Sequence, residues 1–281
     1  MARVQQVTIV GLGLIGGSLG LALKRRHLAR EVVGLSRRAS TLRLAHRRRA
    51  IDWGTTDPAR AVRDADVVVL ATPVSTIVPL AKRLAPLMRP GSLLTDVGST
   101  KAVIVRAIER SLPRGIAFVG GHPLAGSEQR GMAAACADLF DGSVCLLTKT
   151  ARTSPKALAQ LRRLWAALVR RVVVLDPAAH DRLLAQVSHL PHLLAYALVQ
   201  SVSPQARRLA PRSFLEITRV AQSDPALWVD IFLSNHAAIS MALDRFARDV
   251  ATVRRLLRQR NTRTLQQFLR HAQRLRHALP E

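Results

Sequence analysis

The sequence predicts an α/β protein with an N-terminal doubly wound parallel sheet and an all-helical second half. Short apolar runs rich in β-branched residues alternate with segments of helical period up to residue 175. These runs are apolar throughout, which is typical of parallel strands covered by helices on both faces. No convincing strand pattern follows Asp176. We therefore expect a sheet domain at 1–175 and a helical domain at 176–281.

The first half contains seven candidate strands, joined mostly by helical segments. Helical periodicity is clear at 75–88 and at 156–171. The candidate strands are 7–10, 31–35, 66–70, 92–96, 117–121, 144–148 and 172–175. Strands joined by helices indicate crossover connections and hence a parallel sheet.

The second half is expected to be helical from end to end. Residues 176–202 predict one long helix with Pro177 in its first turn and a kink near Pro191, which cannot donate a backbone hydrogen bond. Residues 226–260 predict one or two further helices, and a terminal helix follows Asn261.

The formal charge of +25 does not by itself indicate nucleic-acid binding. Arginine accounts for 38 of the 43 basic residues, and these arginines are spread over most of the predicted helices. Aromatic residues make up only 4% of the chain, so stacking platforms for bases are scarce. We expect no nucleic-acid partner, although a basic field would attract an anionic substrate.

Cysteine usage and hydropathy favour a reduced, cytoplasmic setting. Cys136 and Cys145 form no C-x-x-C pair, and no histidine lies at metal-site spacing from them, so we expect no metal site. Glycines interrupt the apolar N-terminal run, which lacks a signal-peptidase site. No other stretch approaches the roughly 18 apolar residues of a membrane helix.

A glycine motif follows the first strand and opens a helix. In Gly11-x-Gly13-x-x-Gly16, the first glycine permits a tight turn, the second lets the backbone approach a pyrophosphate, and the third lets the helix pack on the strand. Together with Leu14 and Ile15, they would place phosphates at the helix N-terminus. The motif predicts a Rossmann-type dinucleotide site.

The end of the second strand indicates which dinucleotide is bound. An acidic residue there would hold the ribose 2′-hydroxyl of NAD, but this chain has Ser36, Arg37 and Arg38. A hydroxyl and two guanidinium groups suit a 2′-phosphate, so we expect NADP, with NAD as the other possibility. Alternatively, both arginines are ordinary surface residues.

Polar residues follow three further strands. Because ligands bind outside the carboxyl ends of parallel strands, we expect one cleft to contain these side chains. They are Thr72 with Pro73, Ser99 and Lys101, and His122 with Glu128. His122 lies where a strand passes into a loop and precedes a proline that favours an extended backbone. It is either a structural loop residue or a catalytic one, and its position beside a dinucleotide site favours catalysis.

Two groups of residues in the helical half also suggest a site. His189 and His192 flank the expected kink at Pro191. Glu216 and Arg219 stand three residues apart, which fits an intrahelical ion pair or an arginine that binds a substrate carboxylate. Spacing alone leaves both interpretations open.

Taken together, the motifs resemble the prephenate/arogenate dehydrogenase family of tyrosine biosynthesis. The matching stretches run in family order from residue 10 to residue 228: "VGLGLIGGSL", "ATPV", "TDVGSTK", "GGHPLAGSE", "SHLPH" and "TRVAQSDPALW". The resemblance implies an NAD(P)-dependent oxidation of a cyclohexadienyl alcohol, with loss of CO₂. It also implies a homodimer formed through the helical domain.

The resemblance also assigns roles to residues. His122 matches the catalytic base, Ser99 the serine that orients it, and Arg219 the arginine that holds a substrate carboxylate. The other candidate substrate-binding residues are His189, His192, Glu128 and Glu216. The chain departs from the family where a glycine-rich approach to Arg219 is common. Here residues 211–213 include Arg212, which would either line the pocket or point outward.

Two alternative functions remain. Two-domain dehydrogenases of β-hydroxyacids use a catalytic lysine at the start of the helical domain, but the last lysine here is Lys156. A non-catalytic dinucleotide-binding module would not need His122, Ser99 and Arg219 to converge.

Overall fold

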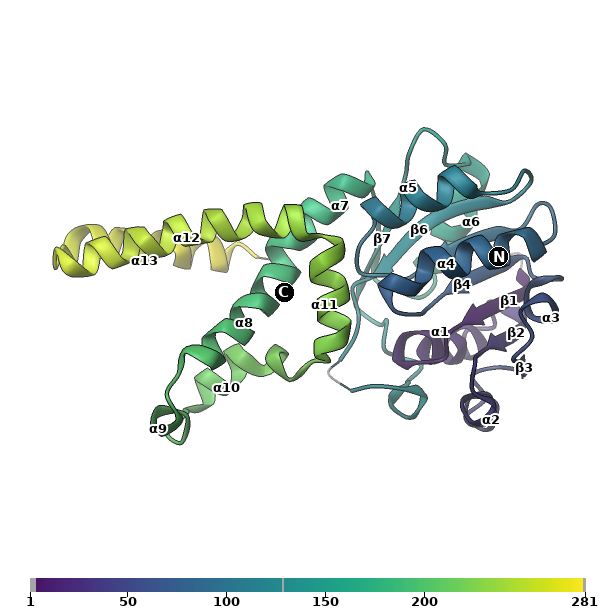
Figure 1. Cartoon of the computed structure of the whole chain (residues 1–281), viewed down its shortest axis with the longest axis horizontal. Coiled ribbons are helices and arrows are strands. Elements are labelled where there is room, and N and C mark those ends of the chain that lie inside the picture. Colours follow the sequence, from purple (N-terminus) through teal and green to yellow (C-terminus); the bar gives the residue numbers. More distant parts are fainter. Residues whose placement is uncertain (1–3, 128, 280–281) are drawn as a thin grey trace. The chain divides into compact units, whose positions relative to one another are not determined.

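The computed structural model describes residues 4–127 and 129–279 and contains one eight-stranded sheet in that part of the chain (Figure 1). The strand order is β3-β2-β1-β4-β5-β6-β7-β8, and every neighbouring pair is parallel except β6 and β7. The strands are β1 (Val4–Val10), β2 (Ala29–Leu35), β3 (Trp53–Thr55), β4 (Val67–Leu70), β5 (Leu93–Asp96), β6 (Ala117–Pro123), β7 (Val144–Thr148) and β8 (Arg171–Leu175). The α/β class is confirmed.

Helices cover both faces of the sheet, as expected for apolar parallel strands. The helices are α1 (Leu14–Arg25), α2 (Ala39–Arg47), α3 (Pro58–Val62), α4 (Val74–Leu84), α5 (Ala102–Ser111) and α6 (Pro155–Ala166). Alternate side chains of one strand enter two different cores. Val67 and Val69 pack with α1, α2 and α6, whereas Val68 and Leu70 pack with α3, α4 and α5. This alternation explains why β4 is apolar at all four positions.

The expectation of an all-parallel sheet is wrong at β7. Among the described residues between β6 and β7, the only helical element is a 3₁₀ turn, Met132–Ala134, and no crossover helix is present. A parallel connection needs such a crossover, so the chain turns back and β7 pairs antiparallel with β6. β6 also continues to Pro123, which places His122 inside a strand and not in the loop that we expected.

The expected long helix after Asp176 is interrupted, but not by a simple proline kink. The Asp176 carboxylate accepts from Ala178 N and Ala179 N, and Pro177 occupies the first turn as predicted. A π-helical segment, Ala185–His189, precedes Pro191. The helices are α7 (Pro177–Leu184), α8 (Leu190–Ser201), α9 (Pro204–Arg207), α10 (Arg212–Thr218) and α11 (Pro225–Ser234).

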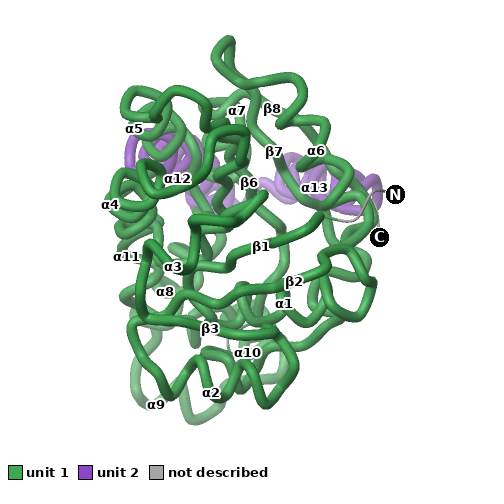
Figure 2. Tube along the Cα trace, turned by 90° about the vertical axis from the view of Figure 1, so that its right-hand side faces the viewer, with its two compact units in different colours: residues 1–235 green, residues 236–281 purple. Residues whose placement is uncertain are grey.

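The chain separates into two compact units, residues 1–235 and residues 236–281 (Figure 2). The first unit contains the sheet together with α7 to α11. The second contains α12 (His236–Arg258) and α13 (Thr262–His277). Within the described residues, no single helix is both long and apolar enough to cross a membrane, although α11 and α12 together pass that test as a bent pair.

A buried ion pair lies under the loop that joins β5 to α5. Lys101 Nζ donates to the Asp96 carboxylate, and both side chains are fully buried. Asp96 also accepts from Gly98 N at 2.9 Å. The expectation that Lys101 faces the cleft is therefore wrong, because its ammonium group is needed to balance the charge of Asp96 in the core.

Lys101→Met should destabilise the protein by about 3–5 kcal/mol, because it leaves the Asp96 carboxylate buried without its counter-charge. The exposed Lys149 provides the matched control, since Lys149→Met should change the free energy of unfolding by less than about 0.5 kcal/mol. Denaturant unfolding of both variants measures the difference. Equal unfolding free energies for the two variants would contradict this account of the pair.

Candidate active site

The glycine turn between β1 and α1 has the geometry of a phosphate cradle. Gly11 has φ +94°, and a Cβ there would lie 2.6 Å from the carbonyl oxygen of Ala71. A Cβ on Gly16 would overlap the Gly11 carbonyl. At Gly13, by contrast, a Cβ would meet no atom within 4 Å, so the backbone is open to a ligand. Leu14 begins the helix, and Gly13 offers no side-chain cap to its N–H groups.

The other predicted cofactor contacts surround this turn. Gly11 N donates to Leu35 O at 3.0 Å, which places the Ser36–Arg38 turn beside it. Arg37 and Arg38 are exposed, and Arg38 N donates to Ser36 Oγ at 3.3 Å. The remaining candidates are Ile15 in the first turn of α1 and, after β4, Thr72 and Pro73. The half-exposed turn thus has open backbone N–H groups and nearby guanidinium groups, which suit a dinucleotide.

His122 is buried at the junction of β6 and β7. It pairs with Leu146, and its side chain lies 2.9 Å, Nδ1 to Nε2, from that of His180 on α7. Burial lowers the pKa of His122 well below 6.5, and electrostatic interactions with His180, Lys101 and His189 lower it further. The ring is therefore neutral at pH 7 and able to accept a proton.

The structure does not place Ser99 against His122 by a hydrogen bond within the described residues. Ser99 is half-buried in the loop between β5 and α5. The side chain that meets His122 is instead that of His180, so the role of Ser99 stays a prediction.

Asp181 and Asn235 tie α7 to its surroundings. The Asp181 carboxylate accepts from Lys101 N at 2.7 Å and from Ala102 N at 2.8 Å, at the start of α5. Asn235 Nδ2 donates to Asp181 O at 2.8 Å and lies 3.1 Å from His189 Nδ1. The sequence pattern did not indicate His180, Asp181 and Asn235, because their partners lie 46–80 residues away along the chain.

His189 offers a buried group without a protein partner. Its side chain is 1% exposed, and its Nε2 has no hydrogen-bond partner in the part of the chain that the structure describes. Burial lowers the pKa of His189 to about 4, so the ring is neutral. Because Asn235 donates to Nδ1, Nε2 carries the ring proton and can donate to a ligand oxygen.

His192 lies against Trp228, which we had not selected. The two rings are stacked, with centroids 3.6 Å apart, and His192 Nδ1 donates to Ser188 O at 2.9 Å. The ring of His189 meets Trp228 edge-on, at 6.2 Å. Burial lowers the pKa of His192, and the positive charge of Arg219 lowers it further. His189 and His192 are thus brought together around one indole, and Arg219 is near enough to act electrostatically on His192.

Glu216 takes a different partner from the one considered above. Its carboxylate pairs with Arg212 Nε at 2.9 Å, one turn apart on α10, and both side chains are exposed. The ion pair between Glu216 and Arg219, one of the two interpretations that the spacing left open, does not form, and Arg212 points outward. Glu128 lies outside the described residues.

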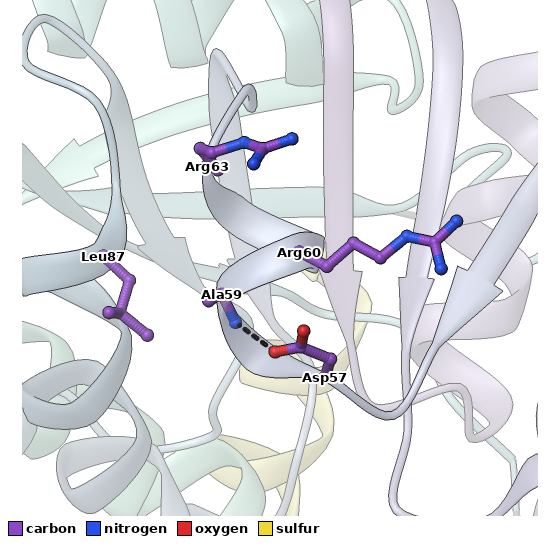
Figure 3. Close-up of a pocket in the computed structure, with 5 residues that line it drawn as sticks. All are labelled: Asp57, Ala59, Arg60, Arg63 and Leu87. Carbon is purple, nitrogen blue, oxygen red and sulfur yellow. Dashed lines mark hydrogen bonds between the residues drawn. The ribbon is translucent and has the colours of Figure 1, made fainter.

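A surface pocket of about 510 Å³ lies elsewhere and includes none of the predicted site residues. Figure 3 shows its lining residues: Asp57, Ala59, Arg60, Arg63 and Leu87. The Asp57 carboxylate accepts from Ala59 N and caps α3, and the Arg60 guanidinium lies over the Trp53 ring. These polar groups thus serve the local fold. Among the described residues, no group of three or more potential ligands is arranged to hold a metal ion.

Comparison with known proteins gives consistent matches over most of the chain. Residues 19–174 match the nucleotide-binding domain of prephenate dehydrogenase, and residues 176–271 match its dimerization domain. A prephenate dehydrogenase of Bacillus subtilis (strain 168) is 34% identical over 98% of this chain and 76% of its own length. A cyclohexadienyl dehydrogenase of Zymomonas mobilis is 34% identical over 99% and 97%.

A solved structure agrees with these sequence matches. The prephenate dehydrogenase of Aquifex aeolicus, in complex with hydroxyphenyl propionate and NAD⁺, superposes with a TM-score of 0.90 at 31% identity, covering 97% of each chain. With both family models matched in order around a nucleotide-binding fold, the chain belongs to the prephenate dehydrogenase family of oxidoreductases.

Proposed function

We propose that this protein oxidises prephenate, arogenate or both, with loss of CO₂ and hydride transfer to NAD(P), giving 4-hydroxyphenylpyruvate or tyrosine. The observation that carries the proposal is His122, a buried and neutral imidazole at the end of β6. Residues 1–175 would bind the cofactor, and residues 176–281 the substrate and a second copy. The matched family ranges, 19–174 and 176–271, support that division.

The residues around His122 can perform the proton chemistry. When bound, the nicotinamide would supply the hydride acceptor. The neutral His122 ring takes the proton of the ring hydroxyl as the carbinol carbon is oxidised. His189 Nε2 donates to a substrate oxygen and so gains the hydrogen-bond partner that it lacks among the described residues. Loss of CO₂ then leaves an aromatic ring, which makes the reaction effectively irreversible.

Anion binding fits the charge of the protein. Prephenate is a dianion, and the formal charge of the chain is +25. Arg219, whose positive charge lowers the pKa of His192, is the candidate for a bidentate contact with a substrate carboxylate. A basic surface also speeds the capture of an anion.

His122→Asn should lower kcat by roughly 10²–10⁴, the usual contribution of a general base, with little change in cofactor affinity. The assay is NADP or NAD reduction, followed at the nicotinamide absorbance, with prephenate and with arogenate. If the wild-type protein turns over neither substrate, the proposed function is rejected. Wild-type kcat in the variant would remove His122 from the mechanism.

We propose that NADP is preferred over NAD, because Ser36, Arg37 and Arg38 stand where an acidic residue would hold the NAD ribose. The Kd of NADP should be lower than that of NAD. Replacing both arginines with alanine should reduce the difference between the two Kd values, since the arginines supply the positive charge that binds the 2′-phosphate. Titration calorimetry measures all four values, and equal wild-type affinities would refute the preference.

Arg219→Ala should raise the substrate KM by roughly 30-fold or more, because a substrate carboxylate loses its bidentate, charge-assisted partner. The KM for the cofactor should barely move. Arg219→Lys should reverse only part of this rise in KM, since lysine keeps the positive charge but cannot make the bidentate contact of a guanidinium group. The exposed Arg212 gives the control, because Arg212→Ala removes only its pair with Glu216. A substrate KM within about twofold of wild type in Arg219→Ala would exclude the contact.

We also propose a homodimer formed through the helical half. Of the twenty exposed large apolar side chains among the described residues, fourteen lie between Leu209 and Leu279. Such a density of exposed apolar residues is typical of a partner surface. Light scattering at micromolar concentration should give the mass of a dimer, with an interface above roughly 1,200 Å². The mass of a monomer would end this proposal.

A cytoplasmic location completes the proposal. Both cysteines are free thiols, Cys136 exposed and Cys145 buried, which suits a reducing compartment.

A further inference from the structure

The buried side chains of His122, His180 and Asp181 form one continuous line of hydrogen bonds. His122 Nδ1 lies 2.9 Å from His180 Nε2, and His180 Nδ1 lies 2.8 Å from Asp181 Oδ1. The exposed fractions of the three residues are 8%, 0% and 4%. His122 comes from β6 and the other two from α7, which contacts β7 and α5 (Figure 1).

The direction of the protons along this line follows from its acidic end. An ionised carboxylate only accepts hydrogen bonds, so His180 must carry a proton on Nδ1. Two backbone N–H groups, those of Lys101 and Ala102, also donate to Asp181. Burial would raise the pKa of Asp181, but the hydrogen bonds from His180, Ala102 and Lys101 outweigh it and lower the pKa. Asp181 is therefore ionised.

His180 is neutral, and this determines the direction of its hydrogen bond with His122. Burial lowers the pKa of His180, although its hydrogen bond to Asp181 opposes this. The other ionisable groups near the two rings are Lys101, Asp96 and His189. Lys101 disfavours a second proton on either ring, while Asp96 partly offsets this at His180. A neutral His180 with its proton on Nδ1 has a lone pair on Nε2, and this lone pair accepts from His122 Nδ1.

We propose that His180 and Asp181 are positioning residues that hold His122 as the Nδ1–H tautomer, so that the lone pair of the base lies on Nε2. This inference rests on the proposed role of His122 as the base. His180 and Asp181 act only through His122, since neither needs to touch the substrate. Without His180, the proton of His122 could move to Nε2 and leave the ring unable to accept there.

The direct test is the tautomer of His122 in the full-length protein without substrate. In protein labelled with ¹⁵N-histidine, nitrogen chemical shifts distinguish a protonated ring nitrogen from one with a lone pair. His122→Asn identifies the signal. A proton on Nδ1 is the expected result, and a proton on Nε2 would overturn the proposal. This test does not depend on turnover, so it remains decisive even if the proposed activity fails.

Kinetics of two His180 variants give the second test. His180→Leu should lower kcat by roughly 10²-fold or more, approaching the loss of the base itself, with the substrate KM within about twofold. His180→Gln should recover at least tenfold of that loss. Its amide N–H can face only Asp181, which turns its carbonyl oxygen towards His122 Nδ1 as the acceptor.

A matched control separates positioning from a general loss of stability. Thr148→Val removes a buried hydrogen bond to Gly120 O from the neighbouring strand but leaves the three-residue line intact. Its kcat should stay within about twofold of the wild-type value. If His180→Leu has the same kcat as Thr148→Val, or if His180→Gln is no better than His180→Leu, the proposal fails while the proposed oxidation still stands.

Discussion

The rest of the site depends on the carboxylate of Asp181. It caps the first N–H groups of α5, so it joins α7 to the helix that follows the β5 strand end. The same carboxylate orients His180, and the backbone carbonyl of Asp181 holds Asn235, which in turn meets His189. The Asp181 carboxylate thus links α7 to the start of α5 and orients His180, and the backbone carbonyl of the same residue orients Asn235 towards His189. Its charge is tolerated because Lys101 N, Ala102 N and His180 Nδ1 all donate hydrogen bonds to it.

The backbone around this anion is irregular at His122 and at His189, the two residues proposed to face the substrate. β6 ends in an antiparallel pairing with β7, which buries His122 between strands where a loop would have left it mobile. The π-helical segment Ala185–His189 widens the helix just before Pro191. His189 is the last residue of that segment, and its Nε2 is the buried donor without a partner. Departures from regular structure therefore occur at the site itself, as they do in many proteins.

The sequence was sufficient where the physical reason is local. The glycine turn is one such case, because tight turns and close approaches require glycine at Gly11 and Gly16. The position of Pro177 in the first turn of α7 is another. The sequence was insufficient where tertiary contacts decide. The three-residue β3 is too short to show a period, and the contact of His122 with His180 joins residues 58 apart. Spacing alone also allows two partners for Glu216, Arg212 at i−4 and Arg219 at i+3, and the structure forms the pair with Arg212.

Burial keeps the His122 ring neutral and able to accept a proton, and it also lowers the stability of the fold at acid pH. The pKa values of His122, His180 and His189 are all lowered, chiefly because burial disfavours the charged ring. As the pH falls below about 6.5, the same rings in the unfolded chain take up protons while the folded rings stay neutral. The unfolded state then binds more protons, so the free energy of unfolding decreases with falling pH. For His189 this loss continues until the folded ring titrates at about 4. The desolvation that keeps a neutral imidazole available in mild acid therefore also weakens the fold there, and the two effects cannot be separated at these positions.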